Sequence, residues 1–352
     1  MKNVFNKALL YKEVKSAKWI TLIMVISIFT YKTMYLMNYE RRLKILEHVR
    51  TPQLKPHLFN ISFFSTNGDQ VIMLLAVILL ATILFKSERQ TETYSFIASM
   101  PFKRKDIIKT KWFVGSCSIF ISFFINAILI SIIFHTKYKN IAIEDSSYII
   151  FQWALINILT YISIFTMILF TQTLMGQNVA ASIVGSIVMF FPTGLLEMIR
   201  QILRVNFIYS YWADSIGTKL VEFTPYFINT VSCTYIPSGN ESDLYNNYFY
   251  EYQNYFTKIV VLIILIVLFY NLAIYIYKIN KLENSGNLIM FSSLEPVFKW
   301  GFSICFGLFV ATIVSSSFDG QNYKIITGSL LIIGSAAGYF ISRKVVRSLS
   351  VS

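Results

Sequence analysis

The sequence predicts an all-α, polytopic integral membrane protein with about eight transmembrane helices. Of its 352 residues, 55% are hydrophobic and only 14% are charged, and the mean hydropathy is +0.57. A soluble domain usually carries about a quarter of charged residues. The composition therefore excludes an ordinary cytosolic enzyme and indicates that lipid surrounds most of the chain.

Eight apolar runs reach or approach the length of about 20 residues that a helix needs to cross the hydrocarbon core. The fourth and fifth are separated only by residues 172–178, where Gly176 and Asn178 favour a tight turn. The fifth and sixth are separated by an aromatic-rich segment, residues 200–257. The predicted spans are Trp19–Met37, Gln70–Lys86, Trp112–Phe134, Ile149–Thr171, Val179–Ile199, Lys258–Tyr277, Val297–Ser317 and Lys324–Ser342.

The distribution of charge predicts the orientation of these spans. The chain has 31 Lys and Arg against 18 Asp and Glu, and an excess of basic residues in loops marks the cytoplasmic side. With the N-terminus inside, residues 1–18, 87–111 and 343–352 carry such an excess, whereas the outer loops are nearly balanced. The basic first outer loop, residues 38–69, runs against this pattern. We expect both termini in the cytoplasm and the chain in the cell membrane, with no nucleic-acid partner.

Sequence motifs for catalysis are absent. The chain has no phosphate-binding Gly-x-x-x-x-Gly-Lys-Ser/Thr loop, no His-Glu-x-x-His, no Cys-x-x-Cys and no Gly-x-Ser-x-Gly. We therefore expect no enzymatic activity, no metal site and no cofactor in this chain.

The spans contain neutral polar residues such as Asn126, Asn157 and Asn271, and Lys32 is assigned to a membrane boundary. Ion-coupled carriers usually keep charged residues at membrane depth. Their expected absence argues against an ion-driven transporter and against a membrane enzyme.

The segment between the second and third spans, residues 87–111, is the richest predicted cytoplasmic stretch. Thr91 can cap a short helix that Pro101 ends, and Tyr94 and Ile97 share one face of it. This helix either presents a stiff contact to a cytosolic partner or lies flat on an anionic membrane surface through its basic residues. The residues alone leave both interpretations open.

The same segment resembles the signature of the ABC-2-type permeases, the transmembrane subunits of ABC exporters. A second stretch, Lys281–Phe291 before Pro296, resembles a cytoplasmic loop of the Ytr-like eight-span branch. Glu92 and Met100 depart from the pattern, since many members carry Gly and Leu there. The positions that match the family pattern are Glu88, Thr93, Phe96, Ile97, Pro101, Arg104, Ile107 and Lys111.

The resemblance implies that residues 87–111 form a coupling helix that docks into a separate ATPase subunit, which holds ATP and Mg. It also implies a second permease copy or a sister permease, and an amphipathic N-terminal helix along the inner leaflet. The implied ATPase-coupling residues are Glu88, Glu92, Thr93, Tyr94, Phe96, Ile97, Pro101, Arg104, Ile107 and Lys111. The implied organisation is 1–18 amphipathic helix, 19–199 spans 1–5, 200–257 extracellular segment, 258–342 spans 6–8 and 343–352 cytoplasmic tail.

The last span carries small residues at helical spacing, Gly328, Gly334 and Gly338, which predict a close helix contact within one subunit or between two. Amphipathic, lipid-like or antimicrobial-peptide cargo is the expectation for a permease of this kind. Acidic residues of the outer segment, such as Asp214 and Glu222, either bind a cationic cargo or simply face solvent. The alternative function is a membrane sensor or scaffold whose extracellular segment binds a ligand.

Overall fold

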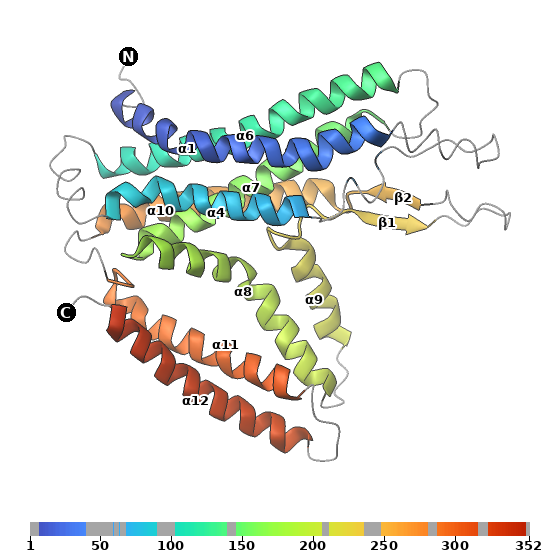
Figure 1. Ribbon diagram of the computed structural model, residues 1–352. Coiled ribbons are helices and arrows are strands. Elements are labelled where there is room, and N and C mark those ends of the chain that lie inside the picture. The colour runs from blue at the N-terminus through green and yellow to red at the C-terminus, as the bar shows by residue number, and fades with distance from the viewer. Residues whose placement is uncertain are drawn as a thin grey trace. The chain divides into compact units, whose positions relative to one another are not determined.

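The computed structural model describes residues 7–39, 59, 63, 68–89, 103–138, 146–205, 211–235, 248–280, 287–315 and 323–349. Among these residues, eight helices are long and apolar enough to cross a membrane, as predicted (Figure 1). The spanning helices are α1 (Lys7–Ile28, continued to Tyr39 through a π-helix, η1, Phe29–Thr33), α4 (Gly68–Arg89), α6 (Arg104–Lys137), α7 (Tyr148–Leu174), α8 (Asn178–Val205), α10 (Tyr255–Ile279), α11 (Glu295–Ser315) and α12 (Tyr323–Leu349).

The observed helices are longer than the predicted spans because apolar length marks only the hydrocarbon core, whereas backbone hydrogen bonding continues into the polar ends. α6 begins eight residues before the predicted third span, at Arg104. α11 begins at Glu295, two residues before the predicted seventh span. The predicted turn between the fourth and fifth spans is present, because α7 ends at Leu174 and α8 begins at Asn178.

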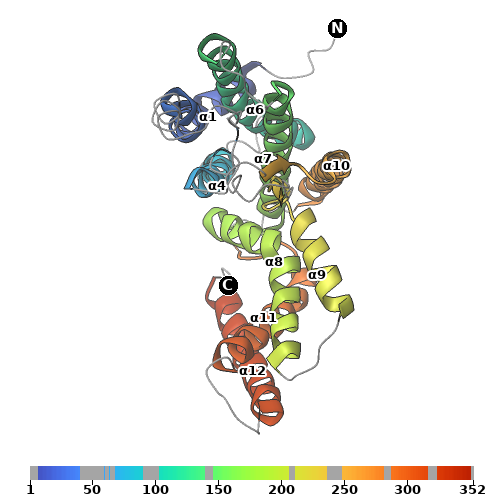
Figure 2. The same cartoon turned by 90° about the vertical axis from the view of Figure 1, so that its right-hand side faces the viewer.

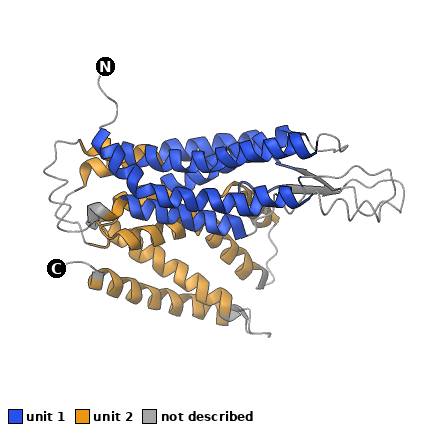
Figure 3. Ribbon diagram, turned by 45° about the horizontal axis from the view of Figure 1, so that its top comes forward, with its two compact units in different colours: residues 1–84, 109–166, 228–268 blue, residues 85–108, 167–227, 269–352 orange. Residues whose placement is uncertain are grey.

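The chain divides into two compact units that interleave along the sequence (Figure 3). Unit 1 comprises residues 1–84, 109–166 and 228–268, and unit 2 comprises residues 85–108, 167–227 and 269–352. α4, α6, α7 and α10 each contribute residues to both units.

In unit 1, the first span starts earlier than the implied organisation requires. α1 is assigned as one helix from Lys7 through Ile28, although Figure 1 shows its first turns at an angle to the rest. Residues 7–18 therefore belong to the same helix as the first span, and their position along the inner leaflet stays a prediction. Glu13 and Ala17 on this stretch are buried, because this end of α1 packs into the protein.

In unit 2, α11 and α12 lie side by side in both views (Figures 1 and 2). A 3₁₀ turn, η3 (Ser292–Leu294), leads into α11. α8 bends part-way along its length (Figure 1), and it carries Pro192 in its interior, where the missing N–H and the ring disturb the helix. α9 (Tyr211–Phe223) follows and packs against α8.

A two-stranded hairpin interrupts the helical fold within the aromatic-rich segment, in unit 1. β1 (Ser232–Tyr235) pairs antiparallel with β2 (Tyr248–Glu251), with Ser232 opposite Glu251. β2 consists largely of aromatic residues, which favour strands. The segment between the fifth and sixth spans is thus partly folded, with α9 and this hairpin in it.

Candidate functional site

Four residues implied for ATPase coupling are described, and three of them, Arg104, Ile107 and Lys111, lie in the first turns of α6. Glu88 lies in the last turn of α4. The segment between these helices is where a partner was expected to dock. The residues of the implied site outside the described part of the chain are Glu92, Thr93, Tyr94, Phe96, Ile97 and Pro101.

Arg104 joins the start of α6 to the end of α10 in unit 2. Its guanidinium donates a hydrogen bond to the backbone oxygen of Asn280 at 2.5 Å. The buried side-chain amide of Asn280 donates in turn to the backbone oxygen of Thr173, near the end of α7, at 2.6 Å. Ile107, one turn after Arg104, is buried. Both residues therefore hold the start of α6 in its unit, and their contact with an ATPase stays a prediction.

The short turn between α7 and α8 pairs with the stretch that follows α10. The backbone N–H of Gly176 donates to the oxygen of Asn287, and the N–H of Met290 donates to the oxygen of Leu174, both at 3.0 Å. A small apolar cluster seals this contact; its buried members are Met175, Ala181, Leu288 and Val346. The turn between α7 and α8 and the stretch after α10 thus meet within unit 2. Together with Arg104 and Asn280 they form what we call the loop junction.

Lys111 is buried, whereas a residue that docks a partner has to be exposed on the surface. Its side chain is fully buried in unit 1, its ammonium lies 3.0 Å from Glu13 Oε1, and it also donates to the backbone oxygen of Leu84. Glu13 is only 1% exposed. In this conformation Lys111 contacts helices of its own chain, α1 and α4, and offers no surface to a partner.

The family model described as "ABC-2 family transporter protein" matches residues 55–236, slightly more than half of the chain. The chain belongs to the ABC-2 transporter family. It is accordingly a multi-pass membrane permease component of an ABC transporter. The match is to ABC-2 proteins in general, so the Ytr-like branch stays a prediction. No curated protein and no solved structure matches this chain.

A second buried ion pair of this ABC-2 protein lies in unit 1 and was not foreseen from the sequence. Lys32, within the π-helix η1, lies with its ammonium 3.2 Å from Asp69 Oδ2 at the start of α4. It also donates to the backbone oxygen of Phe63 and lies over that ring. Both side chains of the pair are at most 10% exposed.

Glu13, Lys32, Asp69 and Lys111 are buried charged residues of the long apolar helices, and of the four only Lys32 falls inside a predicted span. Lys32 was assigned to a membrane boundary, but the first helix continues to Tyr39. The sequence did contain a signal for this ion pair. Lys32 lies inside one apolar run and Asp69 directly before the next, so that the two charges can neutralise each other.

Next to the Lys32–Asp69 pair is a small polar cavity of about 10 Å³, room for roughly one water molecule. Asn157 and Asn229 line it and hydrogen-bond to each other at 2.8 Å. Three of its buried oxygens have no hydrogen-bond donor among the described groups: Asp69 Oδ1, Gln70 Oε1 and Asn229 Oδ1. The cavity therefore favours a hydrogen-bond donor.

Tyr252, which directly follows β2, also lines this cavity. Desolvation by burial, with the neighbouring Tyr255 as a smaller cause, raises the pKa of Tyr252 well above its ordinary value. The phenol consequently keeps its proton at physiological pH. Tyr252 thus adds a hydroxyl to a wall otherwise rich in oxygen acceptors.

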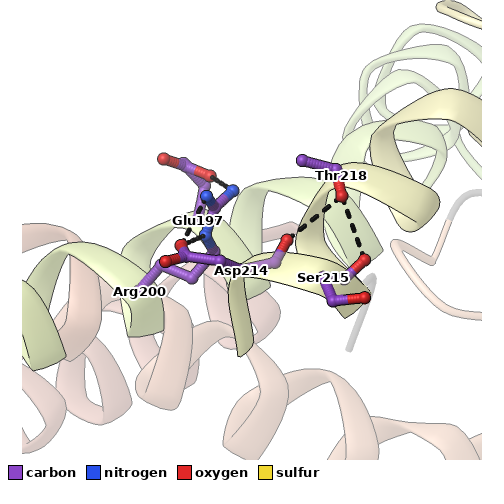
Figure 4. Close-up of polar contacts among 5 residues, drawn as sticks. All are labelled: Glu197, Arg200, Asp214, Ser215 and Thr218. Atoms are coloured by element: carbon purple, nitrogen blue, oxygen red, sulfur yellow. Dashed lines mark hydrogen bonds and ion pairs between the residues drawn. The ribbon is translucent and has the colours of Figure 1, made fainter. Parts of the chain in front are cut away.

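One acidic residue of the segment between the fifth and sixth spans, Asp214, forms an ion pair within the chain (Figure 4). In unit 2 the Arg200 guanidinium lies 2.7 Å from Asp214 Oδ1 and 2.8 Å from Glu197 Oε2, which ties α9 to α8. Gly217 leaves room for this, because a Cβ there would lie 2.8 Å from Arg200 Cδ. Asp214 therefore forms an ion pair that joins α9 to α8 within unit 2, and binding of a cationic cargo by the acidic residues stays a prediction.

Two of the three glycines of the last span pack against α11 of the same chain. A Cβ at Gly334 would lie 3.0 Å from Gly307 Cα, and a Cβ at Gly338 would lie 2.9 Å from Phe306 Cβ. At Gly328 nothing lies within 4 Å of such an atom. The small residues at 334 and 338 thus allow close approach within one subunit, whereas Gly328 has no packing partner there.

Proposed function

We propose that this ABC-2 chain is the transmembrane subunit of an ATP-driven exporter, and that separate ATPase subunits dock on residues 87–111. The observation that carries this proposal is the loop junction, in which Arg104, Asn280 and the α7–α8 turn are joined by hydrogen bonds. A force applied to the segment just before Arg104 would act on a preassembled junction of three helix ends. A flexible loop would absorb such a force instead.

In this proposal the two ATPase subunits bind ATP and Mg and then close against each other. The permease converts that closure into alternating access. Two permease chains, either two identical copies or this chain and a sister chain, form the passage. The complex lies in the plasma membrane, with both termini of this chain in the cytoplasm. The proposed cargo is amphipathic, lipid-like or an antimicrobial peptide, as expected for a permease of this kind.

The docking proposal predicts that Tyr94→Ala or Phe96→Ala removes the ATPase. Removal of an aromatic anchor from an interface costs about 2 kcal/mol or more, a loss of about thirtyfold or greater in affinity. The tagged chain is purified from its native membranes, and ATP hydrolysis and the subunits of the eluate are measured. Tyr11→Ala, which changes an exposed aromatic residue of α1, is the control and should retain the ATPase. Full retention in the Tyr94 and Phe96 variants would favour the sensor or scaffold function.

The orientation proposal predicts opposite labelling of two cysteines in intact cells. Cys233, in β1, should react with a membrane-impermeant thiol reagent, because the outer segment faces outward. A cysteine introduced by Ser95→Cys should react only after the membrane is opened. The described remaining cysteines, Cys117 and Cys305, lie within candidate spans and serve as the background. Labelling of position 95 in intact cells would reverse the topology.

A further inference from the structure

In unit 1, α6 runs beside the first span and is joined to it by polar contacts along its whole length. Lys111 pairs with Glu13 at one end. The side-chain amide of Asn126 donates to the oxygen of Val25 at 3.1 Å and accepts from the Thr33 hydroxyl at 2.9 Å. At the far end the Tyr138 hydroxyl donates to the oxygen of Leu36 at 2.6 Å. Each contact uses a buried side chain of α6 or of the residue that follows it.

The order of these contacts shows that the two helices are parallel, since residue numbers increase together on both. From Glu13 to Leu36 the first span rises by about 35 Å at 1.5 Å per residue. That length exceeds the hydrocarbon core of a bilayer, about 30 Å. Lipid offers no replacement partner for a broken polar contact. Sliding or separation of the two helices would therefore leave several buried polar groups unpaired.

Among these contacts between the first span and α6, the Lys111–Glu13 contact lies nearest in sequence to the proposed docking segment. Lys111 lies seven residues, about two helical turns, after Arg104 in α6. Its second acceptor, the oxygen of Leu84, belongs to α4, the helix that enters the docking segment from the other side. Lys12 lies nearby, with its ammonium 3.8 Å from Glu13 Oε1, but its side chain is 38% exposed. Lys111 is therefore the buried cation that joins α1, α4 and α6.

We propose that Lys111 and Glu13 are a positioning pair that latches the first and third spans together, so that a push on residues 87–111 moves both spans as one body. This inference rests on the proposed function, because the push comes from the ATPase. It gives Lys111 a role different from the docking contact implied by the family pattern. Lys111 transmits the motion and does not touch the partner.

The test uses the permease–ATPase complex in lipid nanodiscs with spin labels at Ile23→Cys on α1 and Ile121→Cys on α6, both exposed positions, in a background without native cysteines. The label distance is measured without nucleotide and with ATP, Mg and vanadate. In the chain with an intact Lys111–Glu13 pair, the distance between the two labels should be the same in both nucleotide states. Glu13→Leu/Lys111→Met removes both buried charges, and Lys12, which also lies near Glu13, is exposed enough to be solvated. The label distance in this variant should shift with nucleotide by about 5 Å, one turn of sliding.

Three further variants control this result. Lys15→Met, an exposed lysine of α1, should behave as the unmodified chain. The charge-swapped Glu13→Lys/Lys111→Glu should restore a constant distance. If this double neutral variant fails to fold, Glu13→Gln/Lys111→Met, which also removes both charges and keeps the shape of the side chain at position 13, takes its place with the same expected shift.

The outcomes separate the latch from the proposed function. A nucleotide-dependent distance in the unmodified chain, or a constant distance in the neutral variant, overturns the latch. Loss of the ATPase from the Lys111 variants also overturns it and makes Lys111 a docking residue. Absence of the ATPase from the unmodified preparation contradicts the proposed function itself, and the latch falls with it.

Discussion

Lys32→Met is expected to lower the free energy of unfolding by about 3–5 kcal/mol, because it leaves the Asp69 carboxylate buried without its counterion. The ammonium of Lys32 is 3.2 Å from Asp69, and Asp69 has another buried oxygen without a donor among the described groups. Thermal unfolding of the purified chain in one detergent measures the loss. We expect a marked fall in the midpoint and in the yield of folded protein.

The matched double variant separates the charge from the packing. Lys32→Met/Asp69→Leu removes both charges at similar volume, and replacement of a buried pair by apolar residues is often close to neutral. It should recover most of the stability lost in the single variant. Lys15→Met, at an exposed position of the same helix, should change little. Equal losses in the single and double variants would mean that the pair does not determine the stability of this region.

Gly338→Leu is expected to destabilise the α11–α12 pair by about 1–3 kcal/mol through overpacking. A Cβ at this position would lie 2.9 Å from Phe306 Cβ and 3.1 Å from Ser303 Cα, and the backbone of Ser303 cannot move without shifting α11. The measurement is again the unfolding midpoint in detergent.

Gly328→Leu is the control from the same helix. Nothing lies within 4 Å of a Cβ there, and loss of glycine from a helix interior gains up to about 1 kcal/mol. This variant should therefore match or slightly exceed the unmodified chain in detergent. If Gly328→Leu instead weakened a dimer, the small-residue face would extend to a second permease copy. Tolerance of leucine at 338 would contradict the close approach of the two helices.

The sequence predicted the number of spans correctly because the cost of exposing a polar backbone to lipid demands long apolar helices, and composition alone reports them. The family signature was likewise readable, since Glu88, Arg104 and Lys111 stand at recognisable spacing. The roles of those residues were less accessible. Nothing in the motif indicates that Lys111 is buried against Glu13, almost one hundred residues earlier in the chain.

The sequence by itself determined that this is a helical membrane protein with eight spans and an ABC-2 motif between the second and third, because those properties depend on local apolar runs and short patterns. Only the tertiary structure decided which buried charged residues neutralise each other. Lys32 meets Asp69 and Lys111 meets Glu13 because separate helices bring them within about 3 Å. A buried charge is tolerated only with such a partner, and the partner's identity depends on how the helices pack.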